Sequence, residues 1–227
     1  MFINKSMCKN VVTIDKEAGI FRAREMMMEH RVRHLPVVDA DNKLIGMVTD
    51  RDVRSAMPSL FIETCDIGEE KERLEKLRVE DIMTRNLITI SPTYTLQDAL
   101  LLMQKHRVGA FPVVDEESNK LKGIISVRDL MRSFINVLGI REPGTLIGVL
   151  VENKQGQMKK IIDAITEEKI SFGSVLVSRY WDEGKRAVFT YLLTNTVAPM
   201  KRKLEKLGFE ILDPMEWYLD QFPKKDE

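Results

Sequence analysis

The chain has 227 residues, of which 44% are hydrophobic and 31% charged, a composition typical of a folded globular protein rather than a disordered one. Lysine plus arginine and aspartate plus glutamate both number 35, so no global charge attracts nucleic acid or an anionic membrane. The two cysteines, Cys8 and Cys65, occur in unrelated contexts, and the three histidines lack metal-ligand spacing, which argues against a disulfide framework and a metal site.

The N-terminus shows no apolar signal-peptide core, and no apolar run approaches the length that spans a bilayer. We therefore expect a soluble, cytoplasmic protein without a membrane or nucleic-acid partner.

The first stretch of the chain predicts the order strand, helix, strand, strand, helix. Residues 11–14 form a β-rich run, and apolar residues at helical spacing follow from Ile20 to Met27. Residues 35–38 and 44–48 then predict a hairpin, and a second helix begins at about Thr49.

The same order returns after an interruption at residues 58–78, where Pro58 and a charge-rich stretch predict a linker helix. A strand is expected at 87–90, a helix from Leu96 to Met103, a hairpin around Pro112, and a last helix that ends at about Leu138. The spacing is 112 − 36 = 76 between the two hairpin prolines and 129 − 52 = 77 between the aspartates that follow the hairpins. An internal repeat of this kind determines the fold more firmly than local propensity does.

Beyond a glycine- and proline-containing boundary at 139–144, the pattern changes to strand, helix, strand, strand, helix, strand. This βαββαβ order is typical of the ferredoxin-like fold. Gly156 lies in the first strand–helix turn, where it is foremost a turn residue and a candidate effector-binding position.

Polar chemistry is concentrated where each hairpin leads into a helix. Thr49 and Asp52, and likewise Ser126 and Asp129, have the spacing of a capping box, and each cap would contribute about 0.5–2 kcal/mol. The same arrangement can bind an anion at the helix N-terminus or hold ribose hydroxyls on the acid. From a single copy, the capping interpretation is the stronger of the two.

The repeated segments resemble tandem cystathionine-β-synthase (CBS) domains, which pack in pairs as a Bateman module. The resemblance rests on an aliphatic–threonine pair, then a Pro-Val-Val-Asp hairpin, then Gly-x-x-Thr/Ser-x-x-Asp, all present twice in order within about residues 1–138. Residues 144–212 are similar to ACT regulatory domains, and this order of units is similar to that of bacterial acetoin-utilisation proteins.

The resemblance implies an α/β (α+β) fold with two βαββα repeats and a ferredoxin-like domain. Its implied segments are CBS repeat 1 (1–57), a linker helix (58–78), CBS repeat 2 (79–138), an ACT-like domain (144–213) and a C-terminal segment (214–227).

The resemblance also implies two adenine-nucleotide sites, with the aspartates on ribose, the hydroxyl residues on the sugar–phosphate side, and the threonines and the residues before each proline around adenine. The implied binding residues are Thr13, Arg33, His34, Leu35, Pro36, Thr49, Arg51, Asp52, Thr89, Gly109, Ala110, Phe111, Pro112, Ser126, Arg128 and Asp129. The first site has Arg33-His34 where the second has Gly109-Ala110, so we expect the first to prefer the more phosphorylated ligand.

We therefore expect a regulatory protein without catalytic activity that binds AMP, ADP or ATP, with S-adenosylmethionine and NAD as alternative ligands. A homodimer and an unidentified protein partner are expected. Two other hypotheses stay open: an enzyme of acetoin or acetyl metabolism, and a structural pair whose Thr/Asp and Ser/Asp residues only cap helices. The sequence contains no Ser-His-Asp order, Gly-x-Ser-x-Gly elbow or Walker loop that would favour the enzyme.

Overall fold

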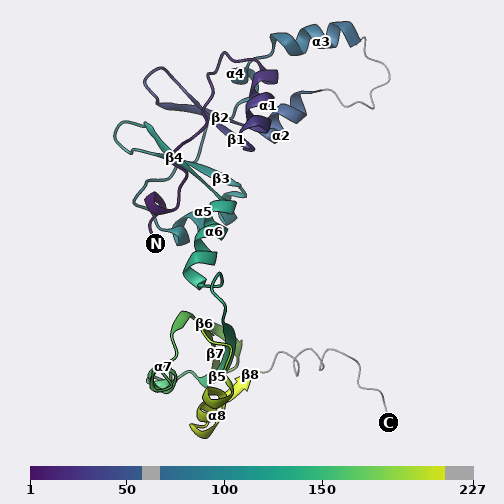
Figure 1. The fold of residues 1–227 in the computed structure, drawn as a ribbon. Helices are drawn as coiled ribbons and strands as arrows, with labels where there is room; N and C mark the ends of the chain where they lie inside the picture. The colour runs from purple at the N-terminus through teal and green to yellow at the C-terminus, as the bar shows by residue number, and fades with distance from the viewer. Residues whose placement is uncertain (58–66, 213–227) are drawn as a thin grey trace. The chain divides into compact units, whose positions relative to one another are not determined.

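The computed structural model describes residues 1–57 and 67–212, which fall into two compact units, 1–131 and 132–227 (Figure 1). Part of the expected linker, with Cys65, and the C-terminal segment 214–227 lie outside the described residues.

The first unit contains the predicted repeat. Its first copy consists of α1 (Ile20–Glu29), β1 (His34–Val38), β2 (Leu44–Thr49) and α2 (Asp50–Ala56). Its second copy consists of α5 (Leu96–His106), β3 (Ala110–Val114), β4 (Leu121–Ser126) and α6 (Val127–Leu138), whose last turns belong to the second unit. Between the copies lie α3 (Ile67–Lys76) and α4 (Val79–Ile82), and a short 3-10 helix η1 (Ile3–Lys5) precedes the first copy.

The two hairpins have the same register. Pro36 faces Met47 in the first and Pro112 faces Ile124 in the second, and each ladder shifts between its last two valines. The helices bury the apolar side chains that the 3.6-residue period predicts. In the first copy, one buried cluster includes Ala23, Met27, Leu35, Val37, Val48 and Val53.

The strands expected at 11–14 and 87–90 are reduced to single parallel bridges. Ile14 donates its N–H to the Pro36 carbonyl and accepts from Val38, and Ile90 does the same with Pro112 and Val114. The next ladder bond toward the N-terminus would need a donor at the proline, which has no N–H. The prolines at the centre of β1 and β3 therefore limit the pairing to one residue.

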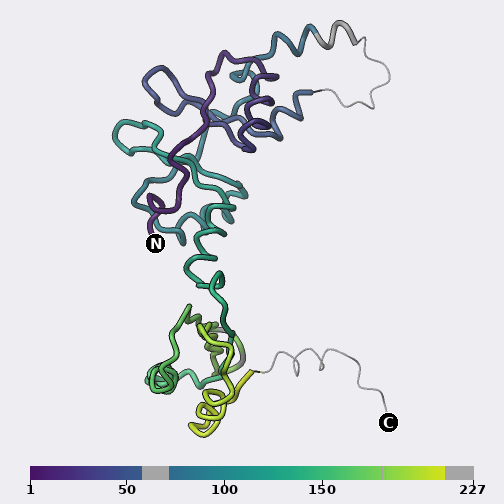
Figure 2. Tube along the Cα trace, viewed as in Figure 1, coloured from purple at the N-terminus to yellow at the C-terminus, as the bar shows by residue number. Residues whose placement is uncertain are grey.

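The segment that precedes each copy pairs with the other copy. We call these the leading segments; the first contains Cys8 and the second contains Thr84. Thr84, which precedes the second copy, exchanges two backbone hydrogen bonds with Met47 in β2 of the first, at 2.9 and 3.0 Å. Cys8, which precedes the first copy, exchanges two such bonds with Ile124 in β4 of the second, at 2.9 and 3.0 Å. The N-terminal segment accordingly runs beside the second hairpin (Figure 2). Each copy is thus completed by residues that belong, by sequence, to the other.

The hairpin tips also pair across the copies. Asn42 and Asn119 both have positive φ angles, 62° and 54°, and each side-chain amide donates to a carbonyl of the other hairpin, at 3.2 and 3.1 Å. Asparagine tolerates this left-handed conformation better than most residues do. The tips therefore fix the two hairpins in an approximately twofold arrangement.

The second unit is a four-stranded antiparallel sheet in the order β6-β7-β5-β8. The elements are β5 (Thr145–Glu152), α7 (Gln157–Glu167), β6 (Phe172–Asp182), β7 (Lys185–Leu192), α8 (Ala198–Lys206) and β8 (Glu210–Leu212). Both helices pack against one face, where Ile161, Ile165 and Leu204 join the buried strand residues. This confirms the βαββαβ order and the ferredoxin-like fold. Gly156 has φ 87°, as its turn position requires.

Candidate functional site

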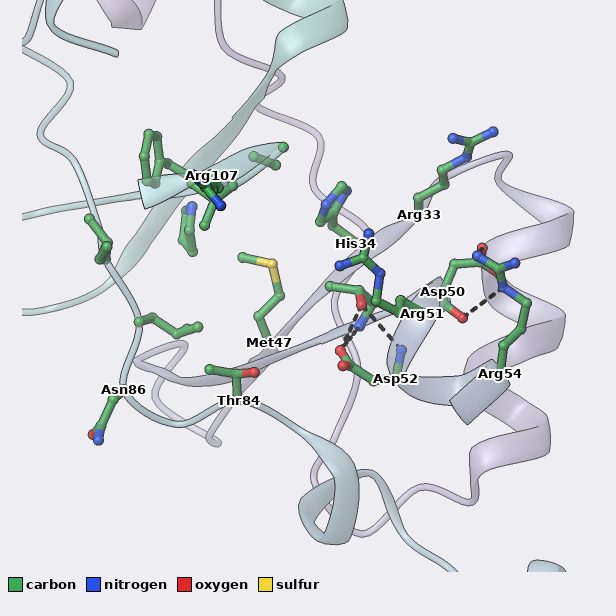
Figure 3. A pocket seen from close by; sticks show the side chains of 18 residues that line it. Arg33, His34, Met47, Asp50, Arg51, Asp52, Arg54, Thr84, Asn86 and Arg107 are labelled. Carbon is green, nitrogen blue, oxygen red and sulfur yellow. Dashed lines mark hydrogen bonds and ion pairs between the residues drawn. The ribbon is translucent and has the colours of Figure 1, made fainter. Parts of the chain in front are cut away.

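A cavity of about 440 Å³ lies in the first unit and is lined by both copies of the repeat (Figure 3). Its volume is in the range of small-molecule sites. The first copy contributes Arg33, His34, Met47, Thr49, Asp50, Arg51, Asp52 and Arg54. The leading segment and hairpin of the second copy contribute Thr84, Asn86, Leu87, Ile88, Arg107, Val108, Gly109, Ala110, Phe111 and Pro112.

Asp52 is held at the N-terminus of α2 by a capping box. Its Oδ2 accepts from the Thr49 backbone N–H at 2.8 Å and from the Thr49 hydroxyl at 2.7 Å, while Thr49 Oγ1 accepts from the Asp52 N–H at 3.3 Å. Among the described residues, no group bonds to Asp52 Oδ1. One carboxylate oxygen therefore fixes the helix start, and the other is available to accept from a ligand hydroxyl.

The charges of the cavity are unbalanced. Four arginines and two aspartates line it, a formal charge of +2. Arg54 forms an ion pair with Asp50 at 2.9 Å. Arg33, Arg51 and Arg107 form no ion pair with any residue in the part of the chain that the structure describes. These three guanidinium groups suit an anionic ligand.

His34 lies at the junction of the two copies and is half-buried. Burial lowers the pKa of its imidazole below the ordinary value of 6.5, the Arg33 charge lowers this pKa further, and the Asp52 charge opposes both effects. A Cβ placed on Gly109 of the other copy would lie 3.7 Å from His34 Nε2. The neutral imidazole is thus favoured next to the backbone of the second hairpin.

The implied binding residues that line the cavity come from both copies, and no single copy supplies a complete set. Residues of the first copy's helix start face the hairpin of the second, and this grouping brings together Arg33, His34, Thr49, Arg51, Asp52, Gly109, Ala110, Phe111 and Pro112. The implied residues that do not line it are Thr13, Leu35, Pro36, Thr89, Ser126, Arg128 and Asp129.

The helix start of the second hairpin has the same geometry as the first. Asp129 Oδ2 accepts from the Ser126 backbone N–H at 3.0 Å and from the Ser126 hydroxyl at 2.6 Å. A further capping box, Thr95 with Asp98, begins α5 with equivalent bonds at 2.9 and 2.6 Å, outside the cavity. Capping is therefore real at each of these three helices, and the cavity is what distinguishes Asp52 from Asp98.

Sequence reasoning missed several lining residues. Met47, Thr84, Asn86, Leu87, Ile88, Arg107 and Val108 line the cavity but were not among the expected binding residues. Most of them come from the second copy, and Thr84 and the residues that follow it reach the cavity because Thr84 pairs with β2. The repeat spacing indicated equivalent positions, but it carried no signal of which copy's leading segment would complete which hairpin.

The second unit has a cavity of about 420 Å³ at the ends of α7 and β7, which Gly156 does not line. Across residues 1–57 and 67–212, no cluster of three or more histidine, cysteine or acidic side chains is arranged to hold a metal ion. None of the helices in these ranges combines the length and the apolar run that crossing a membrane would need.

The first unit is a tandem-repeat α+β module, because it consists of two αββα repeats that exchange leading segments and share a cavity. Comparison with known families is specific: the CBS domain matches residues 3–59 and 79–136, about half of the chain. The protein belongs to the CBS domain family and carries the domain as a tandem pair.

Individual relatives agree with this assignment. A CBS domain-containing protein of Dictyostelium discoideum is 34% identical over 141 residues, which cover 61% of this chain and 94% of that protein. An inosine-5′-monophosphate dehydrogenase of Aquifex aeolicus is 27% identical over 195 residues, which cover 74% of this chain but only 37% of the enzyme. A crystal structure from Vibrio cholerae, with the provisional name acetoin utilization protein (AcuB), matches with a TM-score of 0.52 at 27% identity and covers 63% of this chain and 98% of that chain.

Proposed function

We propose that the first unit is a regulatory module that binds an adenine nucleotide in the shared cavity. The observation that carries the proposal is the combination of Asp52, with one carboxylate oxygen available, and of Arg33 and Arg51, two arginines without ion-pair partners among the described residues, all lining one cavity of about 440 Å³. An acid that accepts from ribose hydroxyls and cations that neutralise phosphates are the two groups that a nucleotide requires.

The proposal is for binding without catalysis. The titratable groups that line the cavity are arginine, aspartate and His34, and Asp52 is committed to the cap through Oδ2. An enzyme of acetoin or acetyl metabolism is the alternative. Turnover in an activity screen that is lost on replacement of Asp52 would favour that alternative.

The proposed ligands are AMP, ADP and ATP, and S-adenosylmethionine and NAD are alternatives because they share the adenosine portion that Asp52 would bind. The excess of positive charge favours the more phosphorylated nucleotides.

The test separates binding from capping with two matched variants. Asp52→Asn and Asp98→Asn each alter an equivalent capping box, but only Asp52 lines the cavity. Isothermal titration with AMP and ATP should show lost or strongly reduced affinity in Asp52→Asn and wild-type affinity in Asp98→Asn. Both variants should show a similar small decrease in melting temperature.

A thermal-shift series provides the independent readout. A nucleotide at about 100 times its dissociation constant should add about 2.7 kcal/mol to the stability of the wild type. No shift with AMP, ADP, ATP, NAD or S-adenosylmethionine would contradict the proposal and favour a pair of repeats in which the acids only cap helices.

We further propose that nucleotide binding is communicated to a partner through the second unit, acting as an ACT-like module. A ligand can do this only through different affinities for the two states of the module, so the response is limited by that difference. The cavity in the second unit and the turn at Gly156 are the two places where an amino-acid effector would be sought.

A further inference from the structure

Arg107 has an unusual backbone conformation for an arginine. It ends α5 in the left-handed region, with φ 54° and ψ 40°, where glycine is the common residue because a Cβ crowds the following carbonyl. Its guanidinium makes no hydrogen bond or ion pair with any residue that the structure describes, although it lines the cavity. The chain therefore keeps a disfavoured residue there without a hydrogen bond or ion pair to a described residue that would compensate for it.

The first copy contains an equivalent arginine with which Arg107 can be compared. Arg31 is the equivalent residue at the end of α1, with φ 52°, and the residue after each arginine donates its N–H in the same way, to Met27 and to Met103. Arg31 does not line the cavity. The two arginines thus share the same backbone cost but differ in access to this site.

The two copies line the cavity with different chemistry: the first contributes mainly charged and polar side chains, and the second contributes mainly apolar ones together with Thr84, Asn86 and Arg107. Arg33, Arg51 and Asp52 belong to the first copy, whereas Leu87, Ile88, Val108 and Phe111 belong to the second. Figure 3 shows Arg107 on one side of Met47, with Arg51 and Asp52 on the other. If ribose is bound at Asp52, the phosphates are best placed toward Arg33 and Arg51, and the base then extends past Met47 toward Arg107 and the second copy's part of the lining.

We infer that Arg107 is the base-binding residue of this cavity, with its planar guanidinium stacked on the purine that the second copy's apolar side chains enclose. The inference rests on the proposed function and adds a ligand orientation to it. Guanidinium planes stack on aromatic rings, and lysine does not replace arginine in that role. Stacking on the base acts equally on adenosine, AMP and ATP, because the contact does not involve phosphate.

The experiment titrates adenosine, AMP and ATP into the full-length wild type, Arg107→Gly, Arg31→Gly and Arg33→Ala. Binding is followed by calorimetry and by the ¹³C-methyl signal of Met47, which lines this cavity. Arg107→Gly should weaken all three ligands by a similar factor of about ten, with little dependence on salt. Arg33→Ala should weaken the affinity for ATP more than that for AMP and leave the affinity for adenosine unchanged. Arg31→Gly should leave the affinity for all three ligands unchanged when binding is followed by the Met47 signal.

Glycine at 107 should not unfold the protein, because it relieves the left-handed strain. We expect the unliganded Arg107→Gly variant to melt at or above the wild-type temperature. Arg107→Asn, which also tolerates this conformation, provides a second substitution, and Arg107→Lys should not restore adenosine binding.

The outcomes separate the two claims. If Arg107→Gly weakens ATP but not adenosine, Arg107 contacts phosphate and the base-stacking inference is wrong. If Arg107→Gly binds all three ligands as the wild type does, the inference also fails while the proposed function stands. If the wild type binds none of the three, the proposed function itself fails.

Discussion

Asp52 serves structure and ligand binding with different atoms of one side chain. Oδ2 closes the capping box with Thr49, whereas Oδ1 accepts no hydrogen bond from a described residue, and the residue lines the cavity. This explains why local sequence alone favours the capping interpretation: the cap exists whether or not a ligand binds. Asp98 shows the same pattern without a cavity, so residue type and spacing alone do not distinguish a cap from a site.

His34 should make stability depend on pH. Burial and the Arg33 charge lower the pKa of its imidazole below 6.5 in the folded protein, so the unfolded chain takes up this proton first as pH falls. The stability contributed by the neutral imidazole is present above pH 6.5 and is lost as pH falls through the lower pKa of the folded state. Urea denaturation of the wild type and His34→Gln between about pH 5 and pH 7.5 measures this, and the variant should lack that part of the pH dependence.

A bound nucleotide should reverse the shift at His34. Phosphate charge in the cavity favours the protonated imidazole, so binding should raise the His34 pKa and take up protons at about pH 6. An NMR titration of the imidazole with saturating ATP, with adenosine as the uncharged control, would show this. An equal pKa with both ligands would place the phosphates away from His34.

At the scale of elements, the exchanged leading segments make the two copies mutually dependent. Ile3 is fully buried, and residues 1–3 bond to Tyr94 and Leu96 of the second copy, as Leu77 and Val79 bond to residues 18–20 of the first. A copy defined by sequence repeat alone is therefore not a packing unit.

Removal of residues 2–8 should destabilise the second copy before the first. The deletion removes the partner of Ile124 in β4 but leaves the bonds between Thr84 and Met47 in place. Native-state hydrogen exchange should show faster exchange at the Ile124 amide and little change at the Met47 amide. Equal acceleration at both amides would contradict the assignment of this segment to the second copy.

The sequence predicted most helices and hairpins, but it did not predict that the leading segments pair with the other copy. The helices and hairpins follow from residue period and from the repeat of Pro36 and Pro112. The strands predicted at 11–14 and 87–90 were wrong, because a proline at the centre of β1 and of β3 removes the donor that a longer ladder needs. The origin of Thr84 and Arg107 in the cavity was not predictable, because it depends on pairing between segments far apart in the chain.

At the scale of the whole molecule, the two copies differ at exposed positions of their helices. Leu100, Leu101, Val127 and Met131 of the second copy are 41–65% exposed, and the equivalent residues of the first copy are Arg24, Glu25, Asp50 and Arg54. We propose that a second copy of the chain covers these exposed apolar side chains in a homodimer. A self-associating patch needs no other partner when a twofold axis passes through it.

Leu101→Glu should therefore shift the protein toward monomer, because it places a charge within the buried contact. Met28→Glu changes a residue that is 69% exposed on the first copy, and it should leave the oligomeric state unchanged. Light scattering during size-exclusion chromatography measures both masses. A monomeric wild type, or a dimer insensitive to Leu101→Glu, would rule out this contact.

The crossing of the leading segments has an evolutionary implication. Two identical single-repeat chains could exchange their N-terminal segments about a twofold axis in the same way that Thr84 and Cys8 now cross within one chain. The tandem pair is thus equivalent to a homodimer whose subunits became joined. Once the copies were joined, the sequence of each copy could change independently of the other. Arg33 in the first copy and Gly109 at the equivalent position of the second both line the shared cavity, and only a fused pair can acquire this kind of asymmetry.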